Sequence, residues 1–192
     1  MARTRRDSGA WISRAPGRSS RIAAFLAPIL LCAALLSGCK EKPAAPASSH
    51  ASVRELFDQT VREFHAPSAE ARGPERERLL SEAAKRYDEQ LKTFPAETNL
   101  CAQALRALGN IHAIRGKTNE AVKLYAAVGE KYPSQDWEVL QAWKSAGDLL
   151  WEAQRREEAK KFYAQIVERF GKNDAPQIIS TVVRGSKARL AE

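Results

Sequence analysis

The sequence predicts an all-α fold over residues 51–192, in which about three antiparallel helical hairpins stack as an α-solenoid and a C-terminal helix caps the stack. Three observations predict this. Helix-forming residues (Ala, Leu, Glu, Lys, Arg and Gln) dominate from residue 51 onward, and β-branched alternation is scarce. Apolar residues recur at helical spacing. Several residue types also return every 38 positions, which is typical of stacked supersecondary units.

An apolar run over residues 22–38 precedes this domain, with six arginines and one acid ahead of it. The run is slightly shorter than the roughly 18 to 20 residues that cross a bilayer as a helix. Positive charge before such a run is typical of an export signal. We therefore expect the rest of the chain to be exported.

A Leu-Ser-Gly triplet stands directly before Cys39 and resembles the lipobox of bacterial lipoproteins. The resemblance implies that residues 1–38 are a lipoprotein signal peptide and that Cys39 receives a diacylglycerol thioether and acyl lipid such as palmitate. An uncleaved anchor and a soluble secreted product are the alternatives. Lys40 follows the cysteine where an aspartate would resemble an inner-membrane retention signal. This favours the outer membrane, facing the periplasm, if the source cell has one.

Residues 39–50 combine the lipidated cysteine with a flexible segment rich in proline and alanine. The eleven residues after Cys39 have nothing to bury and would reach on the order of 35 Å at ~3.1 Å per residue. Such a linker would hold a domain clear of the lipid headgroups.

Most of the net positive charge lies in the N-terminal segment. Residues 1–38 hold six of the 31 basic residues and one of the 23 acidic ones, so the remainder carries 25 against 22 and is nearly neutral. Because it has no basic cluster with interleaved aromatics, we expect no nucleic-acid partner. Cys101 is the single cysteine after Cys39, and we expect it to be a small buried hydrophobe.

The helices follow in order along the domain. A first helix is expected over residues 51–64, a second over 75–94 before Pro95, and hairpins over 104–133 and 142–171. Residues 177–192 carry a further apolar stripe. They should cap the last hairpin, since an open repeat stack exposes an apolar end.

Four columns keep the 38-residue step. They are Glu-Ala at 82–83, 120–121 and 158–159; Tyr87, Tyr125 and Tyr163; Phe94, Tyr132 and Phe170; and Gly109, Gly147 and Gly185.

The stretch "ALRALGNIHAIRGKTNEAVKLYAAVGEKYP", residues 104–133, resembles a tetratricopeptide repeat. Leu105, Leu108-Gly109, Gly116, Ala121, Tyr125 and Pro133 occupy its signature slots. A second copy at 142–171 supplies Trp143, Gly147, Ala159 and Tyr163, but has Gln154 where a turn glycine is usual and Gly171 in place of proline. The step of 38 is similar to that of the longer variant found in envelope-assembly lipoproteins.

The resemblance also implies which residues line a concave groove. They are Gln103, Arg106, Asn110 and Ala113 in one repeat and Gln141, Lys144, Asp148 and Trp151 in the next. Six of these eight are the residues that we expect to bind the partner: Gln103, Arg106, Asn110, Lys144, Asp148 and Trp151. Arg106 and Lys144 would give the groove polarity and Trp151 an aromatic anchor. The alternatives are a solvated polar face and, for Trp151, packing against the terminal helix.

Candidate catalytic groups are few. His112 occupies a slot where these repeats place an aromatic ring, and the adjacent carboxylates belong to solvated helix faces or helix starts. No phosphate loop, nucleophile elbow or Cys/His ligand set is present. We therefore expect a protein that is not an enzyme, with no metal and no cofactor beyond the lipid on Cys39.

The function expected from these features is a membrane-tethered adaptor or scaffold of the bacterial cell envelope, which takes a protein or peptide in its concave groove. The alternative is a structural envelope lipoprotein that self-associates into homo-oligomers. The sequence leaves the partner, the pathway and the oligomeric state open.

Overall fold

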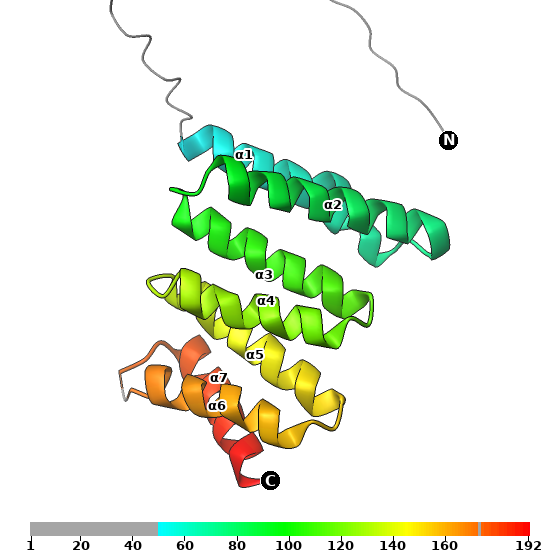
Figure 1. Cartoon of the computed structure of the whole chain (residues 1–192). Helices are drawn as coiled ribbons and strands as arrows, with labels where there is room; N and C mark the ends of the chain where they lie inside the picture. Colours follow the sequence, from blue (N-terminus) through cyan, green and yellow to red (C-terminus); the bar gives the residue numbers. More distant parts are fainter. Residues whose placement is uncertain (1–49, 173) are drawn as a thin grey trace, which may run out of the picture. The chain divides into compact units, whose positions relative to one another are not determined.

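The structure is a computed structural model and describes residues 50–172 and 174–192. Helices account for most of this part of the chain, and it contains no strand. The α-helices, shown in Figure 1, are α1 (His50–Thr60), α2 (Gly73–Thr93), α3 (Thr98–Ile114), α4 (Thr118–Lys131), α5 (Asp136–Glu152), α6 (Arg156–Phe170) and α7 (Gln177–Ala191). The prediction of an all-α hairpin stack is confirmed.

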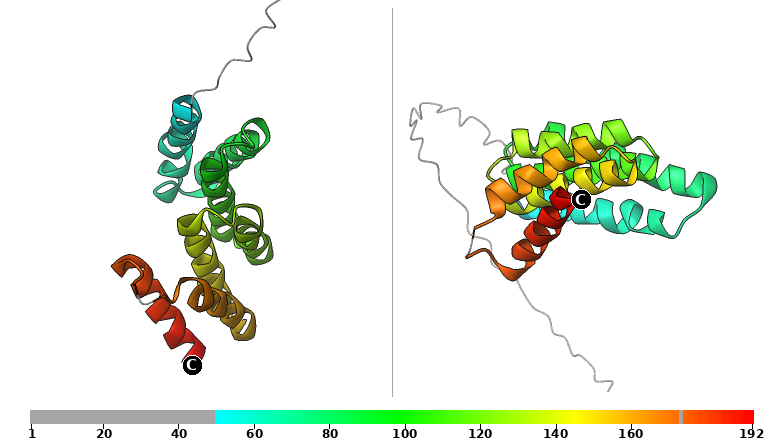
Figure 2. Two further views of the ribbon diagram at one scale, coloured as in Figure 1. Left: turned by 90° about the vertical axis from the view of Figure 1, so that its left-hand side faces the viewer. Right: turned by 90° about the horizontal axis from the view of Figure 1, so that it is seen from below.

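Each helix packs on the next, so α1 and α2, α3 and α4, and α5 and α6 form three hairpins followed by α7. The first helices of successive hairpins also contact one another, α1 with α3 and α3 with α5. Figures 1 and 2 show this stack from three directions. The expectations for Cys39 and the segment before it lie outside the described residues. No helix in the described ranges has the length and apolar character of a membrane span.

The first hairpin contains an insertion between its helices. A π-helical turn, Val61–His65, continues α1, and a short 3-10 turn, Pro67–Ala69, follows it. In the later hairpins, the hydroxyl group of the repeated tyrosine donates a hydrogen bond to a side chain 15 positions earlier in the sequence. Tyr87 of the first hairpin instead forms its hydrogen bond with His65, which lies 22 positions earlier. The insertion therefore keeps the tyrosine in place and supplies it with a different partner.

The turns inside the second and third hairpins have the same backbone geometry. Gly116 has φ +71°, and Gln154, 38 positions later, has φ +61°. A glycine adopts this left-handed conformation without the steric cost that a Cβ brings. The missing glycine therefore leaves the turn unchanged, and Gln154 carries the strain.

Close helix crossing explains two of the repeated glycines. A Cβ built on Gly109 would lie 2.5 Å from the Tyr125 ring, and one on Gly147 would lie 2.7 Å from the Tyr163 ring. Both tyrosines are buried. A glycine in the first helix of each hairpin thus makes room for a tyrosine of the second.

The buried residues form two clusters that meet at α3. The N-terminal cluster joins Val53 and Phe57 of α1 to α2 and to one side of α3, including Leu108. The C-terminal cluster runs from the other side of α3, at Leu105, to α7. Cys101 is buried, as predicted, and its thiol donates a hydrogen bond to the Phe94 carbonyl oxygen at 3.2 Å.

Helix α7 caps the stack but does not continue the repeat. It buries Val183 and Ser186, with Ile179, Val182 and Leu190 partly buried. A Cβ on Gly185 would meet nothing within 4 Å, so this glycine does not share the role of Gly109 and Gly147. Gly185 therefore continues the glycine column in residue type but not in structural role, because α7 packs against the stack through a different face. In Figures 1 and 2, α7 crosses α5 and α6 steeply.

Candidate functional site: a pocket between α5 and α7

A pocket of about 400 Å³ lies where α7 diverges from α5, with α6 at its base. Three of the six residues predicted to bind a partner, Lys144, Asp148 and Trp151, line it from α5. Tyr163 comes from α6. Helix α7 contributes Thr181, Val182, Gly185, Ser186 and Arg189.

Trp151 forms an aromatic wall of the pocket and is only 9% exposed. The Arg189 guanidinium lies 4.6 Å from its ring centroid and that of Arg156 lies 5.0 Å away. The Tyr163 ring meets it edge-on at 6.1 Å between centroids. The sequence allows two interpretations of Trp151, as an aromatic anchor for a partner or as a ring packed against the terminal helix. Its burial agrees with packing against the terminal helix.

Asp148 accepts two hydrogen bonds inside the pocket. The Lys144 ammonium donates to one carboxylate oxygen at 2.5 Å, and the Tyr163 hydroxyl donates to the other at 2.9 Å. Burial, followed by this hydrogen bond, raises the pKa of Tyr163 well above its usual value. Tyr163 therefore keeps its proton and acts as a donor, which makes it unsuited to be a base or a nucleophile.

The charges in the pocket are balanced. Lys144 and Arg189 face Asp148 and Glu152 around the aromatic wall, and the Arg189 guanidinium also bonds the Glu192 carboxylate at 3.3 Å. Such a pocket offers both donors and acceptors beside an apolar surface. It suits a peptide segment that carries charges of both signs better than a simple anion or cation.

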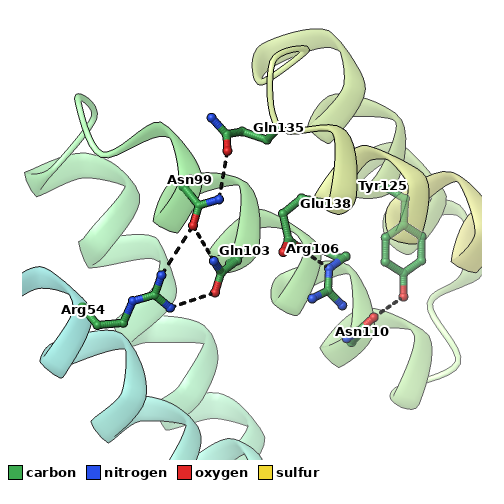
Figure 3. A network of polar contacts seen from close by, with 8 residues as sticks. All are labelled: Arg54, Asn99, Gln103, Arg106, Asn110, Tyr125, Gln135 and Glu138. Carbon is green, nitrogen blue, oxygen red and sulfur yellow. Dashed lines mark hydrogen bonds and ion pairs between the residues drawn. The ribbon is translucent and has the colours of Figure 1, made fainter. Parts of the chain in front are cut away.

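The three remaining predicted residues lie on α3, outside this pocket, and are engaged with neighbouring helices (Figure 3). Gln103 donates to Asn99 at 2.6 Å and accepts from Arg54 of α1 at 3.3 Å. Asn99 in turn donates to Gln135, directly before α5, at 2.9 Å. This polar chain ties α1, α3 and the start of α5 together.

Arg106 pairs with Glu138 of α5, and the Nε–Oε2 distance is 2.6 Å. The Glu138 side chain is only 6% exposed and that of Arg106 27%. A buried carboxylate needs such a partner, so removing the arginine would leave an uncompensated charge. The ion pair therefore places Arg106 in the interface between the hairpin α3–α4 and the hairpin α5–α6.

Asn110 accepts a hydrogen bond from the Tyr125 hydroxyl at 2.7 Å, and burial raises the pKa of Tyr125 to about 12. This contact corresponds to the one between Asp148 and Tyr163, 38 positions later. The structure thus gives Asn110 and Asp148 the same task, which is to hold the tyrosine that lies against the hairpin's glycine.

Sequence reasoning missed Arg189, Glu152 and Ser186 as pocket residues. They lie on α7 and at the end of α5, and the way α7 diverges from the stack is not visible in any repeat column. The other two tryptophans of α5 lie outside the pocket: Trp143 packs edge-on against Phe170 at 6.3 Å, and Trp137 is 43% exposed at the start of the helix.

His112 is partly buried, and its Nδ1 has no hydrogen-bond partner among the residues that the structure describes. Across the described residues, no three His, Cys, Asp or Glu side chains are gathered as metal ligands would be. No protein-family model matches the chain, and a search of curated proteins finds no significant match.

Proposed function

We propose that the chain is a membrane-tethered, non-catalytic adaptor of a bacterial cell envelope, anchored through lipid on Cys39, which binds a peptide segment of another envelope protein in the pocket between α5 and α7. The observation that carries the proposal is the convergence of Lys144, Asp148 and Trp151 on one cavity. The pocket is large enough for several peptide atoms and combines an aromatic wall with paired charges.

The binding half of the proposal is tested by site-specific photo-crosslinking in native membranes. A photoreactive amino acid replaces Lys144, which lines the pocket, and in a control chain replaces Lys123, which is exposed on α4 outside it. We expect a discrete adduct with another envelope protein from position 144 and none from position 123.

A pocket-filling variant sharpens this test. Gly185 lines the pocket and has room for a Cβ, so the side chain of Gly185→Trp should enter the cavity and remove the adduct. An adduct formed only with a second copy of this chain would favour the self-associating alternative. Equal labelling from positions 144 and 123 would contradict a binding pocket here.

The anchoring half is tested separately, by intact mass. The product purified from membranes should begin at Cys39 and carry added acyl mass, whereas Cys39→Ser should keep residues 1–38 and gain no lipid. An unmodified wild-type chain that retains residues 1–38 would contradict the anchor and leave the pocket experiment unaffected.

A further inference from the structure

One side chain of α7 already occupies part of the pocket between α5 and α7. Arg189 lies in the last turn of α7, lines the pocket, and places its guanidinium 4.6 Å from the centroid of the Trp151 ring. It also pairs with Glu192, but the two side chains are 42% and 52% exposed, so this ion pair stabilises its position little. The buried residues of α7 are Val183 and Ser186. The Arg189 side chain can therefore leave the ring while α7 stays packed.

The charges around the pocket require a cation at this place. Lys144 and Arg189 face the carboxylates of Asp148 and Glu152, and the Lys144 ammonium already bonds Asp148 at 2.5 Å. Glu152 is exposed, and the Asp148 side chain is 41% exposed, so an incoming group can reach both carboxylates. If Arg189 moved away, Lys144 would be left against two carboxylates. The pocket would then carry an excess negative charge that another cation could neutralise.

The hydroxyl groups of the pocket favour a ligand that only donates hydrogen bonds. The Tyr163 hydroxyl donates to Asp148 at 2.9 Å, and the Thr181 hydroxyl donates to the Gln177 carbonyl oxygen at 2.9 Å. Each hydroxyl has used its hydrogen and offers the pocket its oxygen. A guanidinium has five N–H donors, no acceptor, and a planar shape that stacks on an aromatic ring. An acidic side chain would instead meet the negative face of the Trp151 ring.

We propose that an arginine of the partner segment binds in this pocket and replaces Arg189 over the Trp151 ring. The inference rests on the proposed function, because it names the side chain that the pocket receives. Arg189 is then an internal competitor, which shows in the free protein the place that the partner's guanidinium takes. It lowers the affinity for the partner according to the fraction of molecules in which it covers the ring.

The test compares two peptides that differ in one charge. Acetyl-Gly-Arg-Gly-amide and its citrulline counterpart, in which a neutral urea group replaces the guanidinium, are titrated into the full chain. Binding is followed by the NMR shift of the Trp151 indole N–H. We expect the arginine peptide to bind about two- to fivefold more tightly, the ratio that an exposed cation–π contact gives.

Displacement is observed directly in the same titration. The Cδ protons of Arg189 should begin at ring-shifted positions and move, as the arginine peptide saturates the pocket, toward those of a free arginine. Arg156 is the internal control, since its guanidinium lies 5.0 Å from the same ring centroid but it does not line the pocket. Its signals should move less.

Two variants on α7 measure the competition. Arg189→Ala removes the competitor and should raise the affinity for the arginine peptide by about two- to fivefold. Arg184→Ala removes the same charge from an exposed position outside the pocket and should leave the affinity unchanged. Equal affinities for the two peptides, or Arg189 signals that stay in place while the Trp151 signal saturates, would overturn the proposal even if Arg189→Ala failed to fold.

The outcome is distinguishable from that of the crosslinking experiment. A crosslink to an envelope protein from position 144 without displacement of Arg189 would overturn this inference and leave the proposed function standing. Displacement of Arg189 without any crosslink would support the exchange of arginines and count against the envelope partner.

Discussion

At the scale of single residues, the glycines of the 38-residue column make the sharpest contrast. We expect Gly147→Ala to destabilise the fold by about 1–3 kcal/mol, because the added methyl group would lie 2.7 Å from the buried Tyr163 ring. Gly185→Ala should instead stabilise it by about 0.5–1 kcal/mol, since the new methyl group meets nothing and alanine favours the helix. Urea unfolding of the two variants measures both effects.

The two changes are chemically identical and lie 38 positions apart, so each serves as the control for the other. Equal destabilisation by both would mean that α7 packs with the same face as α5. The structure excludes that arrangement, because Val183 and Ser186 are the buried residues of α7.

His65 should make stability depend on pH. It lies in the π-helical turn, where its Nδ1 is 2.9 Å from the Tyr87 hydroxyl oxygen. Burial, with the nearby Arg106 charge as a second cause, lowers the pKa of His65 below its usual 6.5. The unfolded chain therefore binds a proton more readily than the folded one. The stabilisation is present above about pH 6.5 and is lost as the pH falls toward the folded-state pKa.

The measurement is the free energy of unfolding at a series of pH values for the wild type and His65→Gln. The wild type should lose more stability than the variant between about pH 7 and pH 5. Parallel curves over that range would show that His65 titrates alike in the folded and unfolded chains.

At the scale of the elements, helix existence and order are predictable from the sequence because they depend on local patterns. The expected helix over residues 51–64 corresponds to α1 together with the π-helical turn Val61–His65, and the one over 75–94 corresponds to α2 (Gly73–Thr93). The expected break between them holds the 3-10 turn Pro67–Ala69. The orientation of α7 was not foreseen. A shared glycine suggests a shared role, but the partly buried Ile179 and Val182 and the buried Val183 decide which face packs inward.

The packing of α7 against Trp151 leads to a prediction about this ring. The prediction distinguishes a ring buried against the terminal helix from an exposed anchor for a partner. Trp151→Ala should cost about 3–5 kcal/mol, because it empties a buried site between Tyr163 and the Arg189 guanidinium. Trp137→Ala removes a ring that is 43% exposed on the same helix and should change stability by less than about 1 kcal/mol. Thermal and urea unfolding of the two variants measure the difference.

A small effect of Trp151→Ala, similar to that of Trp137→Ala, would contradict the burial of this ring and return it to the role of an exposed anchor. Arg189→Ala adds a second check. It removes one of the two guanidinium groups over the ring and should destabilise the fold less than the loss of the ring itself.

At the scale of the whole described domain, the contacts between hairpins explain why only part of the candidate site could be predicted. Family geometry placed all the predicted partner-binding residues on one surface, but partners from other hairpins decide what each of them does. Arg106 is ion-paired with Glu138, Gln103 accepts a hydrogen bond from Arg54, and Arg189 of α7 lies over the Trp151 ring. A repeat pattern in the sequence shows which residues face the same way and does not show which neighbours reach them.

The position of α3 between the two buried clusters leads to the last prediction, which concerns cooperativity. Leu108 packs into the N-terminal cluster and Leu105 into the C-terminal one, so a single helix belongs to both. Neither cluster can lose its share of α3 without exposing apolar surface in the other. We therefore expect the described domain, α1 to α7, to unfold in a single cooperative transition.

Two probes with different coverage measure this in a chain that carries Trp11→Phe. The remaining tryptophans, Trp137, Trp143 and Trp151, all lie in α5, so their fluorescence reports on the C-terminal cluster, whereas far-UV circular dichroism reports on every helix. The two urea midpoints should coincide. In Leu108→Ala, which weakens only the N-terminal cluster, both midpoints should fall together by an amount corresponding to about 2–5 kcal/mol. A fluorescence midpoint that stays in place while the dichroism midpoint falls would show that the stack unfolds from its first hairpin and that α3 does not couple the clusters.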